Sequence, residues 1–318
     1  MSESANINLG LSVTEISVVV RTLNEGRYLD NLLKSINRQA FKSFIVQPIV
    51  NVVLVDSGSS DNTLAVASSH GVEIVKIRQA DFSFGYSLNT GCHNASGQIL
   101  VFVSGHCLPQ GDDWIDCLIR PLLNGQCSYV YGRQLPVEET NFSEAQIFRR
   151  HYPDYDKRPQ KSCFINNANA AIVKSVWEQY RFCEKVKGCE DIEFATRMQV
   201  DGHRIGYVSS APVFHVHDES CWQVARRFER EAATVSSIFS EKRISACTTI
   251  MLAMRCVKSD LRRAKISCKL SPRTIFSILW YRLAQFVGNF NGGSRVLCFG
   301  NLRTKTAPKV NSNLEAKK

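Results

Sequence analysis

The chain has 318 residues, of which 44% are hydrophobic and 21% charged, so it is long enough to form one large domain or two smaller ones. This composition excludes a chain that is disordered throughout. The longest apolar runs, such as Ile99-Val103 and Ile275-Tyr281, are far shorter than the roughly 18 residues of a spanning helix, and Met1-Gly10 lacks a signal-peptide pattern. We therefore expect a cytoplasmic protein.

The net charge of +10 is unevenly distributed along the chain. From Cys221 to Lys318 there are 19 Lys and Arg against 5 Asp and Glu, a balance of +14, which leaves 20 against 24, or −4, for residues 1-220. Aromatic residues are not interleaved with the basic ones as in a nucleic-acid-binding module, so no nucleic-acid partner is expected. A mildly acidic body with a basic C-terminal region instead predicts a docking surface.

Strands and helices alternate in the first third of the chain. Ile16-Val20 and Ile49-Val55 have the pattern of strands buried on both faces, and a third and a fourth strand are expected at Val72-Ile77 and Ile99-Val103. Helical patterns lie between them, at Leu29 to Ile36 with i, i+3, i+4, i+7 spacing, before Gly71, and at Tyr86-Ala95. This alternation predicts an α/β fold with a mostly parallel sheet flanked by helices.

The rest of the chain has a less regular order of elements. Strands are expected at Ser128-Arg133, Gly202-Val208 and Pro212-His217, and helices near Ser143-Arg150, directly after Phe164-Asn169, and at Glu190-Val200, Ser220-Phe239 and Pro272-Phe290. We predict a polar leader at residues 1-15, an α/β domain at 16-218, a basic α-helical extension at 219-302, and a disordered polar tail at 303-318.

Polar segments follow the first two predicted strands. Ligands of parallel sheets bind outside the carboxyl ends of the strands, where Arg21-Glu25 and Asp56-Asp61 lie. The carboxylate of Asp56 can accept hydrogen bonds from a nucleobase or from ribose hydroxyls. Alternatively, Asp56 or Ser59 caps the following helix.

Together these segments resemble a known family. The opening of the chain closely resembles that of family 2 glycosyltransferases, which have the GT-A fold. The elements that match are, in order, a strand, Thr-x-Asn-Glu, an amphipathic helix, a second strand and Val-Asp-Ser-Gly-Ser-x-Asp. The resemblance extends from about Ile16 to His217. It implies a nucleotide-sugar donor, bound by Arg21, Thr22, Asn24, Glu25 and Asp56.

The fourth strand departs from the family pattern. The family has Asp-x-Asp there, with carboxylates that bind a divalent cation, whereas this chain has Ser104-Gly105-His106. His106 aligns with the last aspartate, and Ser-x-His is similar to transferases of surface-polysaccharide pathways. The resemblance implies that His106 contacts the donor and, with His217, binds a divalent cation such as Mn²⁺ or Mg²⁺. Alternatively, His106 donates to a phosphate or makes ordinary hydrogen bonds.

Two segments later in the chain match the catalytic part of the family. Glu190-Asp191 opens a helix, where the helix dipole by itself favours acidic residues. The resemblance implies that Asp191 is the general base and that Glu190 holds the acceptor. Asn167 and Asn169 stand where the family places acceptor contacts, although amides so close together can also cap a helix.

These resemblances imply an inverting hexosyl- or deoxyhexosyltransferase. Its donor is a nucleotide sugar, and its acceptor is a hydroxyl of a surface glycan, such as one linked to a polyprenol. The alternative is a catalytically inactive GT-A domain that binds nucleotide sugars or serves assembly. Pro272-Phe290 has the pattern of a basic amphipathic helix with a Trp, which favours peripheral binding at the inner face of the cell membrane, or packing against its own domain.

Overall fold

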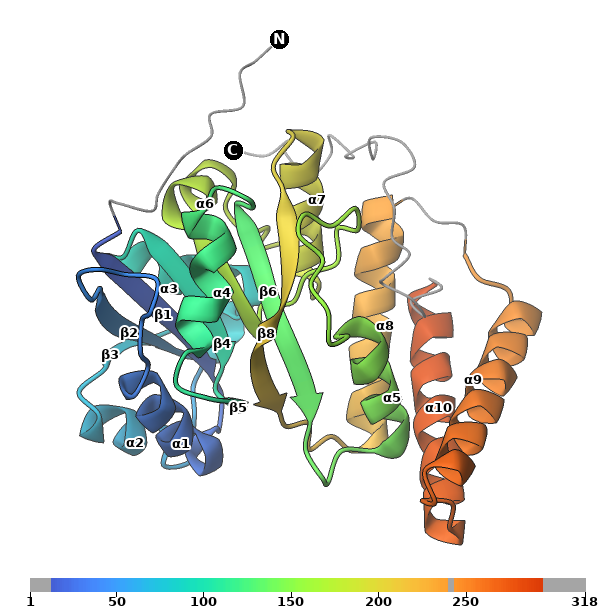
Figure 1. Ribbon diagram of the computed structural model, residues 1–318. Helices are drawn as coiled ribbons and strands as arrows, with labels where there is room; N and C mark the ends of the chain where they lie inside the picture. Colours follow the sequence, from blue (N-terminus) through green and yellow to red (C-terminus); the bar gives the residue numbers. More distant parts are fainter. Residues whose placement is uncertain (1–12, 240–242, 294–318) are drawn as a thin grey trace. The chain divides into compact units, whose positions relative to one another are not determined.

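The computed structural model describes residues 13-239 and 243-293 (Figure 1). The chain divides into two compact units. The sheet unit contains residues up to Val137, Tyr152–Val186 and Glu190–Val216, and the helical unit contains Glu138–His151, Lys187–Cys189 and the chain from His217 onward. The predicted tail at 303-318 and most of the predicted leader lie outside the described residues.

An eight-stranded sheet forms the centre of the sheet unit, in the order β3-β2-β1-β4-β7-β6-β8-β5. Pairs β1–β2, β2–β3, β1–β4 and β6–β8 are parallel, whereas β7 is antiparallel to β4 and β6, and β5 to β8. The strands are β1 Glu15–Thr22, β2 Ile49–Asp56, β3 Glu73–Lys76, β4 Ile99–Ser104, β5 Cys107–Pro109, β6 Tyr129–Pro136, β7 Asn169–Val173 and β8 Ile205–His215. The predicted α/β fold with a mostly parallel sheet is confirmed.

Helices flank this sheet. They are α1 Gly26–Asn37, α2 Thr63–Ser69, the short 3₁₀ helix Gln79–Asp81, α3 Phe84–Asn94, α4 Trp114–Leu123, α6 Lys174–Tyr180 and α7 Glu190–Val200. Helix α3 contacts β1 and β2, and α4 contacts β6, β7 and β8. In α1 the residues that recur at helical spacing, Leu29 to Ile36, are buried as the sequence pattern predicts.

Two predictions for the second half of the chain were wrong. The segment Phe164-Asn169 leads into strand β7 and not into a helix, because Asn169–Val173 is buried between β4 and β6. The two short strands expected at 202-208 and 212-217 are one strand, β8, which ends at His215. Its pairing with β6 shifts register between Gly132 and Gln134, and this irregularity accommodates Pro212 without ending the strand. Strand β5 and helices α4 and α9 were not predicted.

The strand directions bring several chain segments to one edge of the sheet. Strands β1, β2 and β4 are parallel and end there, at Thr22, Asp56 and Ser104. Because β7 is antiparallel to β4, its first residue, Asn169, pairs with Val103 at the same edge. The polar segments that follow β1, β2 and β4 and precede β7 therefore converge on one region.

The helical unit consists of α5 Phe142–His151, α8 Cys221–Phe239, α9 Ala246–Ile266 and α10 Pro272–Gly292. It therefore includes α5, which the predicted division placed in the α/β domain. Helices α8 and α10 share an apolar core of Val224, Ala225, Phe228, Tyr281 and Ala284. A Cβ atom at Gly288 would lie 2.2 Å from the carbonyl oxygen of Ala225, so glycine permits this close helix contact. Across the part of the chain that the structure describes, no helix is both long and apolar enough to span a membrane.

Candidate active site

The loop after β2 is folded around the carboxylate of Asp56. This side chain is 1% exposed, and its Oδ1 accepts hydrogen bonds from the backbone N–H groups of Gly58 and Ser59 at 3.0 Å. The hydroxyls of Ser59 and Thr22 donate to its Oδ2 at 2.5 and 3.3 Å. Four protein donors thus surround the carboxylate, so Asp56 determines the shape of this loop.

Asn24 joins the loop after β1 to the loop after β2. Its backbone is in the left-handed region, with φ 58°, which asparagine tolerates better than most residues. The side-chain oxygen of Asn24 accepts a hydrogen bond from the backbone N–H of Ser60 at 2.8 Å. The backbone N–H of Asn24 donates to the Ser59 hydroxyl at 2.8 Å. The Thr-x-Asn-Glu and Asp-Ser-Gly-Ser motifs therefore form one structural unit.

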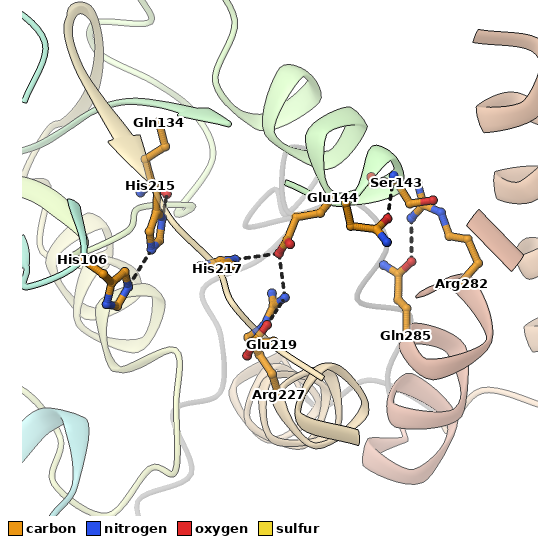
Figure 2. A network of polar contacts seen from close by, with 11 residues as sticks. His106, Gln134, Ser143, Glu144, His215, His217, Glu219, Arg227, Arg282 and Gln285 are labelled. Atoms are coloured by element: carbon orange, nitrogen blue, oxygen red, sulfur yellow. Dashed lines mark hydrogen bonds and ion pairs between the residues drawn. The ribbon is translucent and has the colours of Figure 1, made fainter. Parts of the chain in front are cut away.

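His106 belongs to a chain of four polar side chains in the sheet unit. Its Nδ1 lies 2.6 Å from Glu25 Oε1. On the other side of the ring, its Nε2 is 3.0 Å from Nε2 of His215, and Figure 2 draws this second contact. The Nδ1 atom of His215 lies 2.7 Å from Oε1 of Gln134, which comes from β6. The two imidazole rings are stacked, with an interplanar angle of 16°. Each ring thus has an oxygen at Nδ1, and the two Nε2 atoms face each other.

Gly105 allows this arrangement. A Cβ atom at residue 105 would lie 2.9 Å from Cγ of Glu25 and 3.0 Å from Cγ2 of Thr22. Contacts this short would displace one of the two side chains, so the middle residue of Ser-Gly-His has to be small.

His217, the other predicted metal ligand, lies in the helical unit. Its Nδ1 is 2.6 Å from Oε1 of Glu144, which also lies 2.7 Å from the guanidinium of Arg227 (Figure 2). Burial alone would raise the pKa of Glu144, but His217 and Arg227 together lower this pKa to about 2. Arg227 is also 2.7 Å from Glu219, so its guanidinium bridges the two carboxylates. Shared metal binding by His106 and His217 stays a prediction.

Glu190 and Asp191 form the first turn of α7 and are both buried, with 4% and 8% exposure. The carboxylate of Asp191 accepts from the N–H of Asn167 at 3.1 Å and from the N–H of Ile192 at 2.8 Å. Its pKa is well above the ordinary aspartate value because of burial and because of the adjacent Glu190. Burial also raises the pKa of Glu190. Asp191 thus has a higher proton affinity than a solvent-exposed aspartate.

Arg21, at the end of β1, partly offsets this effect. Its positive charge lowers the pKa of both Glu190 and Asp191, although, among the described residues, it forms no ion pair with either. Its guanidinium lies over the Phe84 ring, 5.0 Å from the centroid. Arg21, predicted to bind the donor, therefore also acts electrostatically on the predicted catalytic pair.

Asn167 and Asn169 have different surroundings, although both were predicted to contact the acceptor. The side-chain oxygen of Asn167 accepts a hydrogen bond from the buried hydroxyl of Tyr129, and its amide lowers the pKa of Glu190. Asn169 is fully buried. Its amide donates to the carbonyls of Arg133 and Ala211, and its oxygen accepts from Trp114. Asn167 therefore faces the acidic pair, whereas Asn169 holds strands and α4 together.

Three residues at the site were missed or not chosen from the sequence. The resemblance favoured His217 as the late histidine of the site, whereas His215, the last residue of β8, is the one that lies beside His106. Gln134 and Tyr129 lie on β6 and belong to no recognisable motif, because their roles depend on contacts with residues far away in the sequence. The pairing Cys107↔His215 between β5 and β8 is what places His215 beside His106.

The fold is that of the GT-A glycosyltransferases. The mannosyltransferase PcManGT from Pyrobaculum calidifontis, solved with GDP-Man and Mn²⁺, superposes with a TM-score of 0.58 at 16% identity over 86% of each chain. Glucosyl-3-phosphoglycerate synthase from Mycobacterium tuberculosis, solved with phosphoglyceric acid, gives a TM-score of 0.53 at 20% identity, over 70% of this chain and 79% of that one. The predicted GT-A architecture is therefore confirmed.

Residues 17–180 match the family model described as Glycosyl transferase family 2, and the chain belongs to this family. It is thus a glycosyltransferase. The O-antigen chain rhamnosyltransferase RfbN of Salmonella typhimurium is 27% identical over 217 residues, 64% of this chain and 67% of the relative. The O-antigen chain rhamnosyltransferase WbaN of Salmonella anatum is 26% identical over 200 residues, 59% of this chain and 63% of the relative. The family resemblance of the sequence is confirmed.

Proposed function

We propose that the protein is an inverting glycosyltransferase that moves a 6-deoxyhexose from a nucleoside diphosphate donor to a hydroxyl of a lipid-linked surface glycan. The observation that carries the proposal is the buried acidic pair Glu190-Asp191, which opens α7 and whose Asp191 is held by two backbone N–H groups. Two similar proteins named as O-antigen rhamnosyltransferases support the sugar and the glycan class.

In the proposed reaction, Asp191 removes the proton from the acceptor hydroxyl as its oxygen attacks the anomeric carbon. The bond to the donor phosphate breaks on the opposite side, so the configuration inverts, and the nucleoside diphosphate leaves with the electron pair. The raised pKa of Asp191 suits this role, because a base with greater proton affinity accepts a proton from a hydroxyl more readily. Glu190 would hold the acceptor.

The donor would lie along the loops that follow β1 and β2. Asp56 and Thr22 would bind the nucleoside, with ligand N–H or hydroxyl groups replacing the rotatable hydroxyls of Ser59 or Thr22. Asn24 fixes the two loops relative to each other. The charge of Arg21 would interact favourably with the leaving diphosphate.

A divalent cation fits the pair His106 and His215. Imidazole binds metals through an unprotonated ring nitrogen, and metal-binding histidines usually donate the other N–H to a carboxylate or carbonyl. Glu25 and Gln134 occupy those positions, at Nδ1 of each ring, and the two Nε2 atoms lie 3.0 Å apart, where an ion would take the place of the proton between them. Mn²⁺ or Zn²⁺ suits such a nitrogen pair better than Mg²⁺ does. When bound, the ion would supply charge neutralisation at the donor diphosphate.

The proposed place of action is the inner face of the cell membrane, where a lipid-linked acceptor is accessible. Purified protein should transfer sugar from a nucleoside diphosphate rhamnose to an acceptor glycan, and nuclear magnetic resonance of the product should show an inverted anomeric configuration. A retained configuration would contradict the mechanism. Binding of the donor without turnover on any surface-glycan acceptor would instead favour an inactive, nucleotide-sugar-binding domain.

Metal binding can be tested without substrate by calorimetric titration of Mn²⁺. The wild-type protein should bind one ion, and His106→Ala and His215→Ala should each reduce the affinity by about 10-fold or more. His93, an exposed histidine at the end of α3, provides a matched control, and His93→Ala should not change the titration. Unchanged Mn²⁺ affinity in His106→Ala would eliminate the proposed ligand pair while leaving the transferase proposal intact.

A further inference from the structure

Helix α10 is apolar on two opposite faces, but only one of them is covered. Ile278, Tyr281 and Ala284 are buried, and Tyr281 and Ala284 belong to the core shared with α8. The other face is exposed along the whole helix: Phe276 66%, Leu279 48%, Trp280 49%, Leu283 52%, Val287 45% and Phe290 36%. A continuous row of exposed large apolar side chains marks an interaction surface, and nothing among the described residues covers this one.

The exposed face continues into the turn between α9 and α10. We define residues 262-276, which comprise the end of α9, the turn and the start of α10, as the hairpin tip (Figure 1). Three large apolar side chains are exposed in it: Ile266 71%, Leu270 44% and Phe276 66%. Phe276 stacks on Trp280, with 6.1 Å between the ring centroids, and extends the apolar surface along α10.

The hairpin tip is strongly basic. It contains five exposed cationic residues and no Asp or Glu: Arg262, Arg263, Lys265, Lys269 and Arg273. Among the described residues, none of the five forms an ion pair. The one acidic residue of 243-293, Asp260, is buried and bonded to Arg282. The charge at the tip is therefore available to an external partner.

We propose that the hairpin tip and the exposed face of α10 bind the surface of an anionic lipid bilayer. Cations attract anionic headgroups, and large apolar side chains such as Phe276 and Trp280 insert at the boundary between headgroups and acyl chains. A second copy of the chain does not fit, since pairing two such tips would bring like charges together. Nucleic acid would satisfy the charge but would leave Ile266 and Leu270 against a polar backbone.

This inference deepens the proposed function, because a lipid-linked acceptor is reached from a membrane surface, but its test requires neither donor nor acceptor. The full chain is mixed with vesicles of phosphatidylcholine alone or with about 30% phosphatidylglycerol, and floated on a density gradient at low and high salt. The wild-type protein should float with the anionic vesicles at low salt, and less at high salt.

Two variants separate the contributions of charge and insertion. Lys265→Glu/Lys269→Glu/Arg273→Glu should reduce the vesicle affinity by about 100-fold or more, since each cation contributes roughly fivefold. Ile266→Ser/Leu270→Ser/Phe276→Ser should also lose binding, with its charge intact. The control Arg38→Glu/Lys76→Glu/Lys161→Glu changes three exposed cations of the sheet unit and should float more than the hairpin variants.

Fluorescence gives a second reading from the surface itself. In a Trp222→Phe background, Trp280 is the exposed tryptophan, because Trp114 and Trp177 are buried, and its emission should shift to the blue on binding. Wild-type protein that stays at the bottom of every gradient would overturn the inference. So would apolar-tip variants that float as well as the wild type, or a wild-type dimer that the same substitutions dissociate. Sugar transfer to a soluble acceptor is assayed separately. It tests the proposed function and does not depend on whether the protein binds vesicles.

Discussion

Each of the two units contains a buried carboxylate, and the pKa values of these two groups are shifted in opposite directions. In the sheet unit, burial and the neighbouring Glu190 raise the pKa of Asp191 well above its ordinary value. In the helical unit, burial alone would raise the pKa of Glu144, but contacts with His217 and Arg227 lower it to about 2. Glu144 is bonded to a guanidinium, whereas Asp191 forms no ion pair among the described residues, and this difference in partners gives the two pKa values their opposite directions.

The largest effect should come from Asp191→Asn. Loss of the base should reduce kcat by about 10²–10⁴-fold, while donor binding, measured by calorimetry, is retained. Asp112→Asn, which changes an exposed carboxylate, is the control. A variant with more than half of the wild-type activity would rule out Asp191 as the base.

The same substitution should not destabilise the fold. Because the pKa of Asp191 is higher in the folded than in the unfolded state, its charged form disfavours folding, and this cost appears as the pH rises. Asp191→Asn should therefore raise the melting temperature at pH 8, and the gain should disappear toward low pH. A lower melting temperature at pH 8 would show that the carboxylate stabilises the protein.

Glu144→Gln should have the opposite effect on stability. It removes the carboxylate that His217 and Arg227 share and leaves Arg227 with Glu219 alone, so the free energy of unfolding at pH 7 should fall by about 1–3 kcal/mol. The pKa of Glu144 is lowered in the folded state, so its stabilising effect is present above its unfolded pKa and is lost as the pH falls toward about 2. Urea unfolding at pH 7 and pH 3 measures this. Equal stability of variant and wild type at pH 7 would contradict the comparison.

Glu190→Gln sharpens the comparison within the sheet unit. Removing the neighbouring carboxylate removes one cause of the raised pKa of Asp191. The acid limb of kcat/KM should therefore move to lower pH, although the maximum rate falls if Glu190 also holds the acceptor. If the acid limb of the kcat/KM profile stays at the same pH in Glu190→Gln, the ionisation that causes this limb is not that of Asp191.

Tyr129→Phe should have the smallest effect. It removes the hydroxyl that orients the Asn167 side chain beside the acidic pair, and we expect kcat to fall by about fivefold, with the donor KM unchanged. Tyr131→Phe is a matched control, because this buried hydroxyl on the same strand bonds to Gln160 instead. Equal losses of kcat in the two variants would indicate a general structural effect and not positioning of the catalytic pair.

The parts of the fold that the sequence predicted correctly depend on local patterns. Buried runs such as Ile99-Val103 and the helical spacing from Leu29 to Ile36 need no distant information. Strand β7 was missed because its sequence, Asn-Ala-Ala-Ile-Val, has no alternation and its alanines also suit a helix. Its place between β4 and β6 is decided by tertiary pairing.

The candidate site, like the fold, was predictable from the sequence only where it depends on local motifs. Asp56, Asn24 and Asp191 lie in contiguous motifs, so the sequence alone singles them out as candidates, whereas it does not predict the contact of His106 with His215. This contact depends on the register Cys107↔His215 between a three-residue strand and a strand far along the chain. No spacing within either segment encodes that register.

The close approach at Gly105 links residues that a mutational survey would treat as independent. A larger residue at position 105 meets Glu25 and Thr22, so it becomes acceptable only in a chain that has also acquired smaller side chains at those positions. Single-site libraries would record all three positions as intolerant. A combinatorial library that varies residues 22, 25 and 105 together should recover active triplets that no stepwise series of single substitutions reaches.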